Sequence, residues 1–273
     1  MIWNAGNGQV RLDGTAMSFV SFGYGEKALI VLPGLSDGLA TVRGKALLLA
    51  KPYRQFFERY TVYMFSRKDD MPQGYSIRAM AADQARAMQI LGVEKASVLG
   101  VSQGGMIALC LAIDHPQMVS RLAVAVSAPG VNDVIRQCVP DWIAFAEQGD
   151  HRRLMIDTAE KSYSERYLKK YRKLYFLLGR LGRPADYGRF LINARAILSF
   201  DVSRELRSIA CPALIIGALE DRIVGADASR EMARQIPESE LYLYSDLGHA
   251  AYEEAKDFND RVYRFLEGSR QRL

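Results

Sequence analysis

The stretch KASVLGVSQGGMIALCLAI, residues 95–113, contains a serine at the junction of two apolar elements. Residues 97–101 form an apolar run that predicts a buried strand. From residue 103 onward, the apolar side chains recur with the spacing of a helix. Ser102 lies between these elements, with glycines at positions 100, 104 and 105. The stretch therefore predicts a strand that passes into a helix through a very sharp turn, with Ser102 at its apex.

This turn makes Ser102 a candidate nucleophile. A sharp strand-to-helix turn holds its apical side chain above the edge of the sheet. Gly100 and Gly104 leave out side chains that would collide where the strand and the helix approach each other. The unpaired N–H groups and the dipole at the helix start also favour a developing negative charge there. The alternative is a glycine-rich turn in which Ser102 only caps the helix.

Strand and helix signals alternate over both ends of the chain. The segment QVRLDGTAMSFVSFG predicts an opening hairpin that turns at Asp13-Gly14. Apolar runs predict further strands over residues 28–32, 60–66, 121–127, 213–218 and 241–245. Helices are predicted over most of 39–58, over 76–92 with Ser76 as the cap, over 103–114 and over 254–267. This alternation predicts an α/β protein with a mostly parallel sheet covered by helices on both faces.

Residues 131–200 interrupt the alternation, because they predict several helices and no strand. We interpret them as a helical cap or lid inserted into an α/β core formed by residues 1–130 and 201–273. Within this insertion, residues 151–195 hold 12 Lys or Arg against 4 Asp or Glu, a local charge of +8 in a chain of net charge +5. Such a block could attract anionic substrates, membranes or nucleic acid. We interpret it as the solvated face of amphipathic helices.

A serine nucleophile needs a base, and the chain contains three histidines. His115 lies at the far end of the helix that begins after Ser102, roughly 18 Å from its start. His151 lies in the basic insertion, where we expect a surface residue. His249 follows the last predicted strand, so it should emerge at the same sheet edge as Ser102. His249 is therefore the predicted base.

The base in turn needs a carboxylate to orient it. Asp221 follows the strand over 213–218 and should emerge at the same edge, and the order Ser, Asp, His along the chain supports it. Its neighbour Glu220 is the main rival. Asp133, after the strand over 121–127, is a reserve, whereas Asp246 is interpreted as a turn residue.

The oxyanion that forms during attack on an acyl group needs two N–H donors. One should be the backbone N–H of Gln103, directly after the nucleophile. The other should come from LPGLSDG, residues 32–38, where Gly34 lets the backbone approach and Leu35 is the best candidate. Leu35 could also simply line the pocket with its apolar side chain.

The composition fits one sizeable α/β domain with an insertion, since 49% of the 273 residues are hydrophobic and 25% are charged. No apolar stretch approaches the ~18 residues of a membrane span, and MIWNAGNGQVRLDG lacks the pattern of a secretory signal. Cys110, Cys138 and Cys211 fit neither a disulfide framework nor a clustered metal site. We expect a cytoplasmic protein that uses no cofactor or metal and acts on a small molecule rather than a nucleic acid. Its oligomeric state stays open.

Residues 10–130 and 205–268 resemble the α/β-hydrolase superfamily, in its branch with a serine nucleophile and a cap domain. The likeness is carried by YSIRAMAADQARAMQILGVEKASVLGVSQGGMIALCLAIDHPQMVSRLAVAVSAP, by ALIIGALEDRIV and by LGHAAYEEAKDFNDRVYRFL. It implies an eight-stranded, mostly parallel sheet with a helical cap. It also implies catalytic roles for Ser102, Asp221 and His249, and oxyanion roles for Leu35 and Gln103.

The sequence departs from this family at two places. Pro33 stands where many members have a histidine, and FSRKDDMPQGYS lacks the usual Asp-x-Arg-Gly pattern. A serine at position 102 points away from the haloalkane dehalogenases and epoxide hydrolases of this fold, which use aspartate. The resemblance implies a serine hydrolase of esters or related acyl compounds, closest to carboxylesterases. The alternative is a small-molecule receptor, or a cofactor-free lyase or haloperoxidase-type enzyme. Candidates for the residues that select the substrate are the cap aromatics Trp142, Phe145, Tyr163 and Tyr167.

Overall fold

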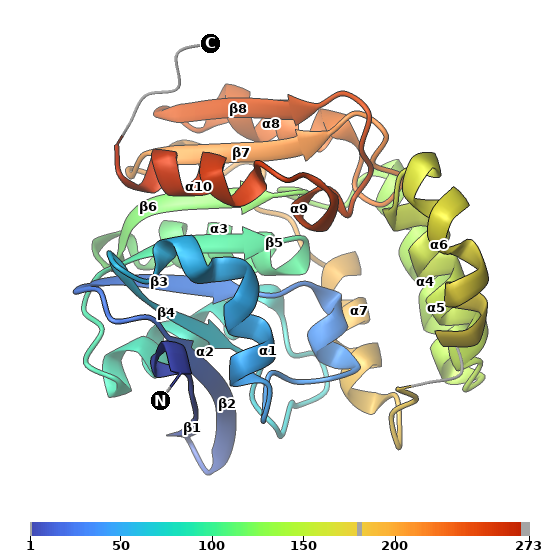
Figure 1. The fold of residues 1–273 in the computed structure, drawn as a ribbon, viewed down its shortest axis with the longest axis horizontal. Helices are drawn as coiled ribbons and strands as arrows, with labels where there is room; N and C mark the ends of the chain where they lie inside the picture. The colour runs from blue at the N-terminus through green and yellow to red at the C-terminus, as the bar shows by residue number, and fades with distance from the viewer. Residues whose placement is uncertain (1, 179–181, 269–273) are drawn as a thin grey trace.

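Eight strands form one sheet in the order β1-β2-β4-β3-β5-β6-β7-β8 (Figure 1). The structure is a computed structural model that describes residues 2–178 and 182–268. The strands are β1 Gly6–Leu12, β2 Thr15–Phe22, β3 Lys27–Leu32, β4 Tyr60–Phe65, β5 Ala96–Val101, β6 Val119–Ala125, β7 Ala213–Ala218 and β8 Ser239–Tyr244. From β4 to β8 all neighbours pair in parallel, whereas β1 and β2 are antiparallel. The predicted eight-stranded, mostly parallel sheet is confirmed.

Helices cover both faces of this sheet. Over the described residues the helices, including those of the insertion, are α1 Ala46–Ala50, α2 Ile77–Ile90, α3 Gln103–Asp114, α4 Asp133–Glu147, α5 His151–Ser162, α6 Glu165–Leu178, α7 Gly188–Leu198, α8 Ala226–Gln235, α9 Ala251–Glu254 and α10 Phe258–Leu266. Figure 1 shows α1 and α10 in front of the sheet, with α2, α3 and α8 behind it. This arrangement explains why the central strands β5 and β7 are buried along their whole length.

The two faces of the sheet form separate apolar clusters. On β3, Ile30 and Leu32 pack with residues of α2, α3 and α8. The alternate residues Leu29 and Val31 pack with residues of α1 and α10. Successive side chains of a strand point to opposite faces, so a strand between two helix layers is apolar throughout. The continuous apolar runs of the sequence are explained in this way.

Local signals in the sequence placed several turns and caps correctly. Asp13 and Gly14 both have positive φ, at 45° and 90°, as the tight hairpin between β1 and β2 requires. Ser76 caps α2, because its Oγ accepts a hydrogen bond of 3.1 Å from the N–H of Ala79.

Three helix predictions were wrong or incomplete. Residues 39–45 are not helical, so the helical part of 39–58 begins only with α1. The predicted helix over 254–267 begins later than expected, because the backbone is extended at Ala255 and α10 starts only at Phe258. Helix α8 was not predicted; it buries only Ala228, Ser229 and Met232, which is too short an apolar pattern to recognise.

Helices α4 to α7 lie between β6 and β7 in the chain, and no strand occurs in the described part of 131–200. The two connections to this insertion run side by side. The N–H of Val131 donates to Phe200 O at 3.1 Å, and the N–H of Val202 donates to Pro129 O at 2.7 Å. Figure 1 shows α4, α5 and α6 at one side of the molecule, whereas α7 lies against the core. The division into a core and a cap at residues 131 and 200 stays a prediction.

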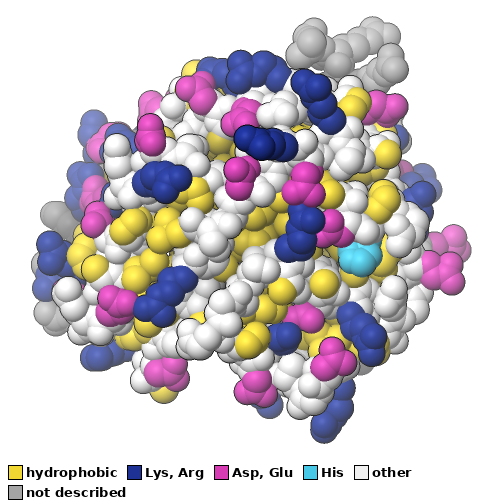
Figure 2. Space-filling view, turned by 180° about the vertical axis from the view of Figure 1, so that it is seen from behind, with side chains coloured by type: hydrophobic (Ala, Val, Ile, Leu, Met, Phe, Trp, Pro, Cys, Tyr) yellow, Lys and Arg dark blue, Asp and Glu magenta, His cyan; other side chains and the backbone are white. Residues whose placement is uncertain are grey.

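The charged side chains of the insertion largely face solvent. On α6, Lys169, Lys170 and Arg172 are exposed, whereas Leu168 is buried. Figure 2 shows positive and negative side chains interspersed over the face opposite to that of Figure 1. In the described ranges, no helix combines the length and the apolar character that a membrane crossing needs.

The turn between β5 and α3 leaves no room for a side chain at Gly104. A Cβ atom there would lie 1.9 Å from the carbonyl oxygen of Leu32. We therefore expect Gly104→Ala to lower the free energy of unfolding by about 3 kcal/mol, measured by urea denaturation. The control Gly6→Ala places its Cβ 3.7 Å from Ser21 Oγ, an ordinary contact, and should change stability by less than ~1 kcal/mol. Equal stability losses in the two variants would contradict this account.

Candidate active site

Ser102 occupies a strained turn between β5 and α3. Its φ of 54° and ψ of −122° lie in a region that residues with a side chain rarely adopt. The turn is so tight that a Cβ at Gly100 would lie 2.4 Å from Gly104 O. The main chain of Ser102 is held by hydrogen bonds to β6 and the loop after it, from its N–H to Ala125 O at 2.9 Å and from Ser127 Oγ to its carbonyl at 2.8 Å. The surrounding structure thus fixes the strained conformation.

The side chain of Ser102 does not cap the helix. The structure gives it no capping hydrogen bond, although Ser102 occupies the N-cap position of α3. Its Oγ instead lies 2.9 Å from His249 Nε2. This geometry rules against the interpretation of Ser102 as a simple helix cap and brings the predicted nucleophile to the predicted base.

His249 lies in the loop between β8 and α9 and is buried, with 6% of its surface exposed. Its Nδ1 lies 2.8 Å from Asp221 Oδ2. With Nδ1–H donating a hydrogen bond to the carboxylate, Nε2 has a free lone pair that can accept the proton of Ser102 Oγ. The ring is therefore oriented for general-base chemistry at Ser102.

Asp221 follows β7 and is held as an anion. Its other oxygen, Oδ1, accepts hydrogen bonds from the N–H groups of Ile223 at 2.8 Å and Val224 at 3.0 Å. Burial by itself would raise the pKa of Asp221, but the His249 ring and these backbone donors outweigh burial and lower the pKa below its ordinary value. The carboxylate can therefore stabilise an imidazolium next to it.

The rival residues lie elsewhere. Glu220 and Asp133 are exposed, and Asp246 lies 3.9 Å from Arg166 in an exposed ion pair. Among the histidines, His115 ends α3, as predicted. His151 was expected at the surface, but this is wrong, because it is buried among the helices of the insertion at the start of α5.

The loop after β3 runs directly beside Ser102. A Cβ at Gly34 would lie 3.3 Å from Ser102 Cβ and 3.7 Å from its Oγ, so a larger residue here would crowd the serine. Leu35 follows and begins the short 3-10 helix η2 (Leu35–Gly38), while Gln103 is the first residue of α3. The first N–H groups of a helix have no acceptor within it. Both predicted oxyanion residues therefore begin helical segments beside the nucleophile.

A cluster of polar residues next to Leu35 and Gln103 was not predicted from the sequence. We call it the arginine cluster, and it consists of Asp37, Arg67, Arg189, Gln103 and Asn193, of which all but Arg189 are buried outright. Arg67 belongs to FSRKDD, the segment that departs from the family pattern. The signal available in the sequence was an arginine directly after a predicted strand, at the same sheet edge as Ser102.

Two of the cap aromatics considered for substrate selection have hydrogen-bonded polar groups. Trp142 is buried, and its Nε1 donates to Asp157 Oδ2 at 2.8 Å. The Tyr163 hydroxyl donates to Glu253 Oε2 at 2.5 Å, and its ring stacks on Tyr167 at 4.5 Å between centroids. Phe145 is half-buried beneath the guanidinium of Arg153. Their role in substrate selection stays a prediction.

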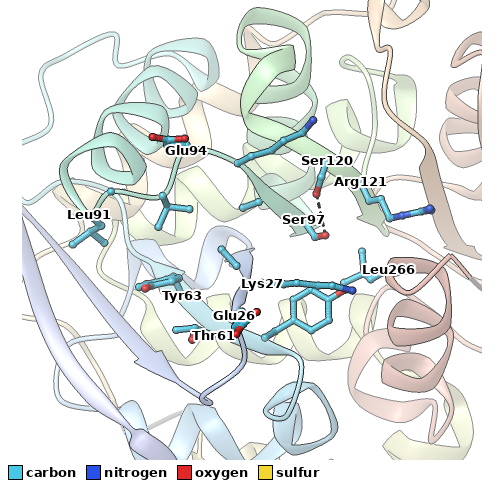
Figure 3. A pocket seen from close by; sticks show the side chains of 16 residues that line it. Glu26, Lys27, Thr61, Tyr63, Leu91, Glu94, Ser97, Ser120, Arg121 and Leu266 are labelled. Carbon is cyan, nitrogen blue, oxygen red and sulfur yellow. Dashed lines mark hydrogen bonds between the residues drawn. The ribbon is translucent and has the colours of Figure 1, made fainter.

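A cavity of about 730 Å³ lies at the opposite end of the sheet (Figure 3). Its lining includes residues where the parallel strands begin, among them Lys27, Thr61 and Ser97, with Ser97 hydrogen-bonded to Ser120 at 3.3 Å. Ser102 follows the other end of β5. This cavity is therefore separate from the candidate active site.

Thiol chemistry has no support in the described residues. Burial raises the pKa of the Cys110 and Cys138 thiols to about 12, so neither supplies a thiolate at neutral pH. The same part of the chain holds no group of three or more His, Cys, Asp or Glu side chains placed to bind a metal ion.

Comparisons with known proteins identify the family. The family model described as the alpha/beta hydrolase fold matches residues 27–148. A relative from Klebsiella pneumoniae, named "Putative carbamate hydrolase RutD", is 30% identical over 191 residues, which cover 66% of this chain and 68% of the relative. The chain belongs to the α/β-hydrolase superfamily. The protein of the same name from Caulobacter sp. (strain K31) is 26% identical and covers 86% of this chain and 90% of its own length.

Solved structures of other proteins have the same fold. The enol-lactonase from Burkholderia xenovorans LB400 matches with a TM-score of 0.82 at 20% identity, covering 95% of this chain and all of its own, 100%. A thermophilic esterase from Thermogutta terrifontis matches with a TM-score of 0.75 at 18% identity, covering 98% of this chain and 100% of its own. The names of the sequence relatives support a hydrolase.

The pKa of the Asp221 carboxyl group can be measured directly. We expect its carboxyl group to titrate below the ordinary aspartate value of about 3.9, so its contribution to stability is present above that pH and is lost as the pH falls through the lowered pKa. In His249→Ala the pKa should rise, because burial remains while the imidazole is removed. The measurement is carboxyl ¹³C NMR of aspartate-labelled protein, with Asp221→Asn to assign the signal. A titration at or above about 3.9 in the unmodified protein would contradict the account.

Proposed function

We propose that the protein is a serine hydrolase that cleaves an ester or a related acyl bond of a small molecule through an acyl-enzyme on Ser102. The observation that carries this proposal is the pair of hydrogen bonds that joins Asp221 to His249 at 2.8 Å and His249 to Ser102 at 2.9 Å. A buried anion, an oriented imidazole and a strained serine in one line form the arrangement that acyl transfer requires.

In the first half of the reaction, His249 Nε2 accepts the proton of Ser102 as Oγ attacks the carbonyl carbon. The resulting oxyanion is held by the N–H groups of Leu35 and Gln103. The imidazolium then gives its proton to the leaving group as the bond to that group breaks, which leaves the acyl group on Ser102. Asp221 stabilises the imidazolium during this step without taking its proton.

The second half repeats the same chemistry with water as the nucleophile. His249 takes a proton from water, the hydroxide adds to the acyl carbon, and the oxyanion forms again at the same two donors. The intermediate collapses as Ser102 Oγ leaves and regains its proton from His249. The acid is released and the free enzyme is restored.

The names of the related proteins suggest which acyl compounds to test. Several sequence relatives bear the name carbamate hydrolase, and structures with this fold include an enol-lactonase and esterases. Esters, lactones and carbamates each have a carbonyl carbon bound to a heteroatom, so the mechanism on Ser102 is shared. We place simple carboxylic esters first and small carbamates second, and a panel of both classes with matched acyl size would rank them.

Ser102→Ala removes the nucleophile and leaves the fold in place. We expect it to lower kcat on a p-nitrophenyl ester by about 10⁴-fold or more and to abolish stoichiometric labelling by a fluorophosphonate. Ser120→Ala is the matched control, because Ser120 lines the cavity at the opposite end of the sheet and should keep full labelling and activity. Labelling that persists in Ser102→Ala would defeat the assignment. A receptor that uses this fold without turnover would show ligand binding in both variants and no hydrolysis in the parent protein.

The pH dependence tests the base. We expect kcat/KM to fall as the pH is lowered, because protonated His249 cannot accept the proton of Ser102. The lowered pKa of Asp221 places its own titration at the acid end, so its protonation would add to the fall only at the lowest pH values. Asp221→Asn should reduce kcat by about 10⁴-fold at neutral pH, because the imidazole loses its orientation and its counter-charge. Rates of ester hydrolysis from pH 4 to pH 9 check this, and a rate independent of pH down to pH 4 would argue against an imidazole base.

A further inference from the structure

The arginine cluster brings three charged side chains into the protein interior beside the candidate oxyanion donors. Asp37 lies in η2, Arg67 follows β4, and Arg189 comes from α7 in the insertion. The side chains of Arg67 and Asp37 are each 1% exposed, and that of Arg189 is 18% exposed. These charges are therefore held within the protein and do not form part of its solvated surface.

Arg67 contacts both segments that carry the candidate donors. Its Nη2 donates to Gln103 Oε1 at 2.8 Å. Its backbone N–H donates to Asp37 Oδ2 at 3.0 Å, and Asp37 lies two residues after Leu35 in the same short helix. One residue thus links the start of α3 to the loop after β3.

Helix α7 is bonded to the same two segments. Arg189 Nη2 donates to Asp37 Oδ2 at 2.9 Å and to Arg67 O at 2.7 Å, and its Nη1 donates to Lys68 O at 2.7 Å. Gln103 Nε2 donates to Asn193 O, one turn further along α7, at 2.7 Å. The position of α7 is therefore coupled to both candidate donors.

The packing of α7 against η2 is close enough to transmit a displacement. A Cβ at Gly38 would lie 2.9 Å from the Cα of Phe190, so the two backbones are in direct contact. Because packed backbones cannot compress, a shift of α7 moves η2 with it. The arginine cluster and this contact act on the same short helix.

Burying the charges of this cluster costs free energy of desolvation. Two guanidinium groups face one carboxylate, and burial lowers the pKa of Arg67, although a guanidinium keeps its proton. An ion pair of this kind often contributes less to stability than apolar residues of similar volume would. The cluster fixes the geometry of the two segments, and it places excess positive charge beside Gln103.

We infer that Arg67 and Arg189 are positioning residues that hold the N–H groups of Leu35 and Gln103 in place for the oxyanion and make this placement depend on the docking of α7. This inference rests on the proposed acyl-enzyme mechanism. An oxyanion donor works only when it is aimed at the developing charge, and a displacement of 1 Å can cost about 10²-fold in rate.

The test replaces each arginine with methionine, which keeps an unbranched side chain and removes the hydrogen bonds. For Arg67→Met and Arg189→Met we expect kcat on a p-nitrophenyl ester and the rate constant of fluorophosphonate labelling to fall about 10- to 100-fold. KM should change less than about 3-fold, and the acid limb of the pH profile should stay where it is, because the triad is untouched. Arg78→Met is the matched control: it breaks the bidentate, solvent-exposed bond to Glu205 at 2.7 Å and should keep wild-type rates.

Thermal unfolding of each variant distinguishes a displaced oxyanion donor from a failure to fold. If Arg67→Met does not fold, Arg189→Met and Gln103→Met decide, since the latter keeps the backbone N–H and loses both side-chain hydrogen bonds. Folded variants with wild-type kcat, or with a raised KM and an unchanged kcat, would overturn the inference. These outcomes leave the proposed function intact as long as Ser102→Ala abolishes labelling; labelling retained in Ser102→Ala would remove the proposed function and the inference together.

Discussion

The close approach of α3 to β3 is the constraint on which the site depends. Gly104 lies against the carbonyl oxygen of Leu32 with no space for a Cβ, and Gly100 has the same relation to Gly104. A helix that begins this near the sheet forces the connecting residue into a left-handed conformation, which Ser102 adopts at a φ of 54°. Strain of this kind costs of order 1–3 kcal/mol and persists only where neighbouring groups hold it. Here the hydrogen bonds to Ala125 and Ser127 do so.

Once the turn is fixed, the parallel sheet brings the other residues to it. Loops that follow parallel strands collect at one edge, so residues after β7 and β8 meet the residue after β5 although they are far apart in sequence. His249 is 147 residues from Ser102, yet their side chains are at hydrogen-bond distance. Topology, more than any local motif, therefore explains why the three side chains form one site.

The sequence was informative where local chemistry decides the outcome. A glycine-flanked serine between an apolar run and a helical pattern predicts its own turn, and elimination among three histidines pointed to His249. Patterns with little apolar content were not recognisable, which is why α8 and the break before α10 were missed. The arginine cluster was missed for a different reason, since only Arg67 gave a local signal. Arg189 donates to the backbone of Arg67, 122 residues away in the sequence, and no local pattern predicts this contact.

The insertion has two parts with different relations to the site. The connections at its two ends are hydrogen-bonded to each other, from Val131 to Phe200 and from Val202 to Pro129. A second attachment lies beside His249, where the N–H of Ala250 donates to Ser162 O at 2.8 Å. Helix α7 then returns to η2 and to Gln103, whereas the charged residues of α6 face solvent. A shift of α7 would therefore also displace the segments of Leu35 and Gln103, which carry the candidate oxyanion donors. The outer helices are attached to the site as well, because α4 packs on α7 and the turn between α5 and α6 is bonded to the loop that carries His249. Sequence change in the insertion can therefore act on the site through both attachments.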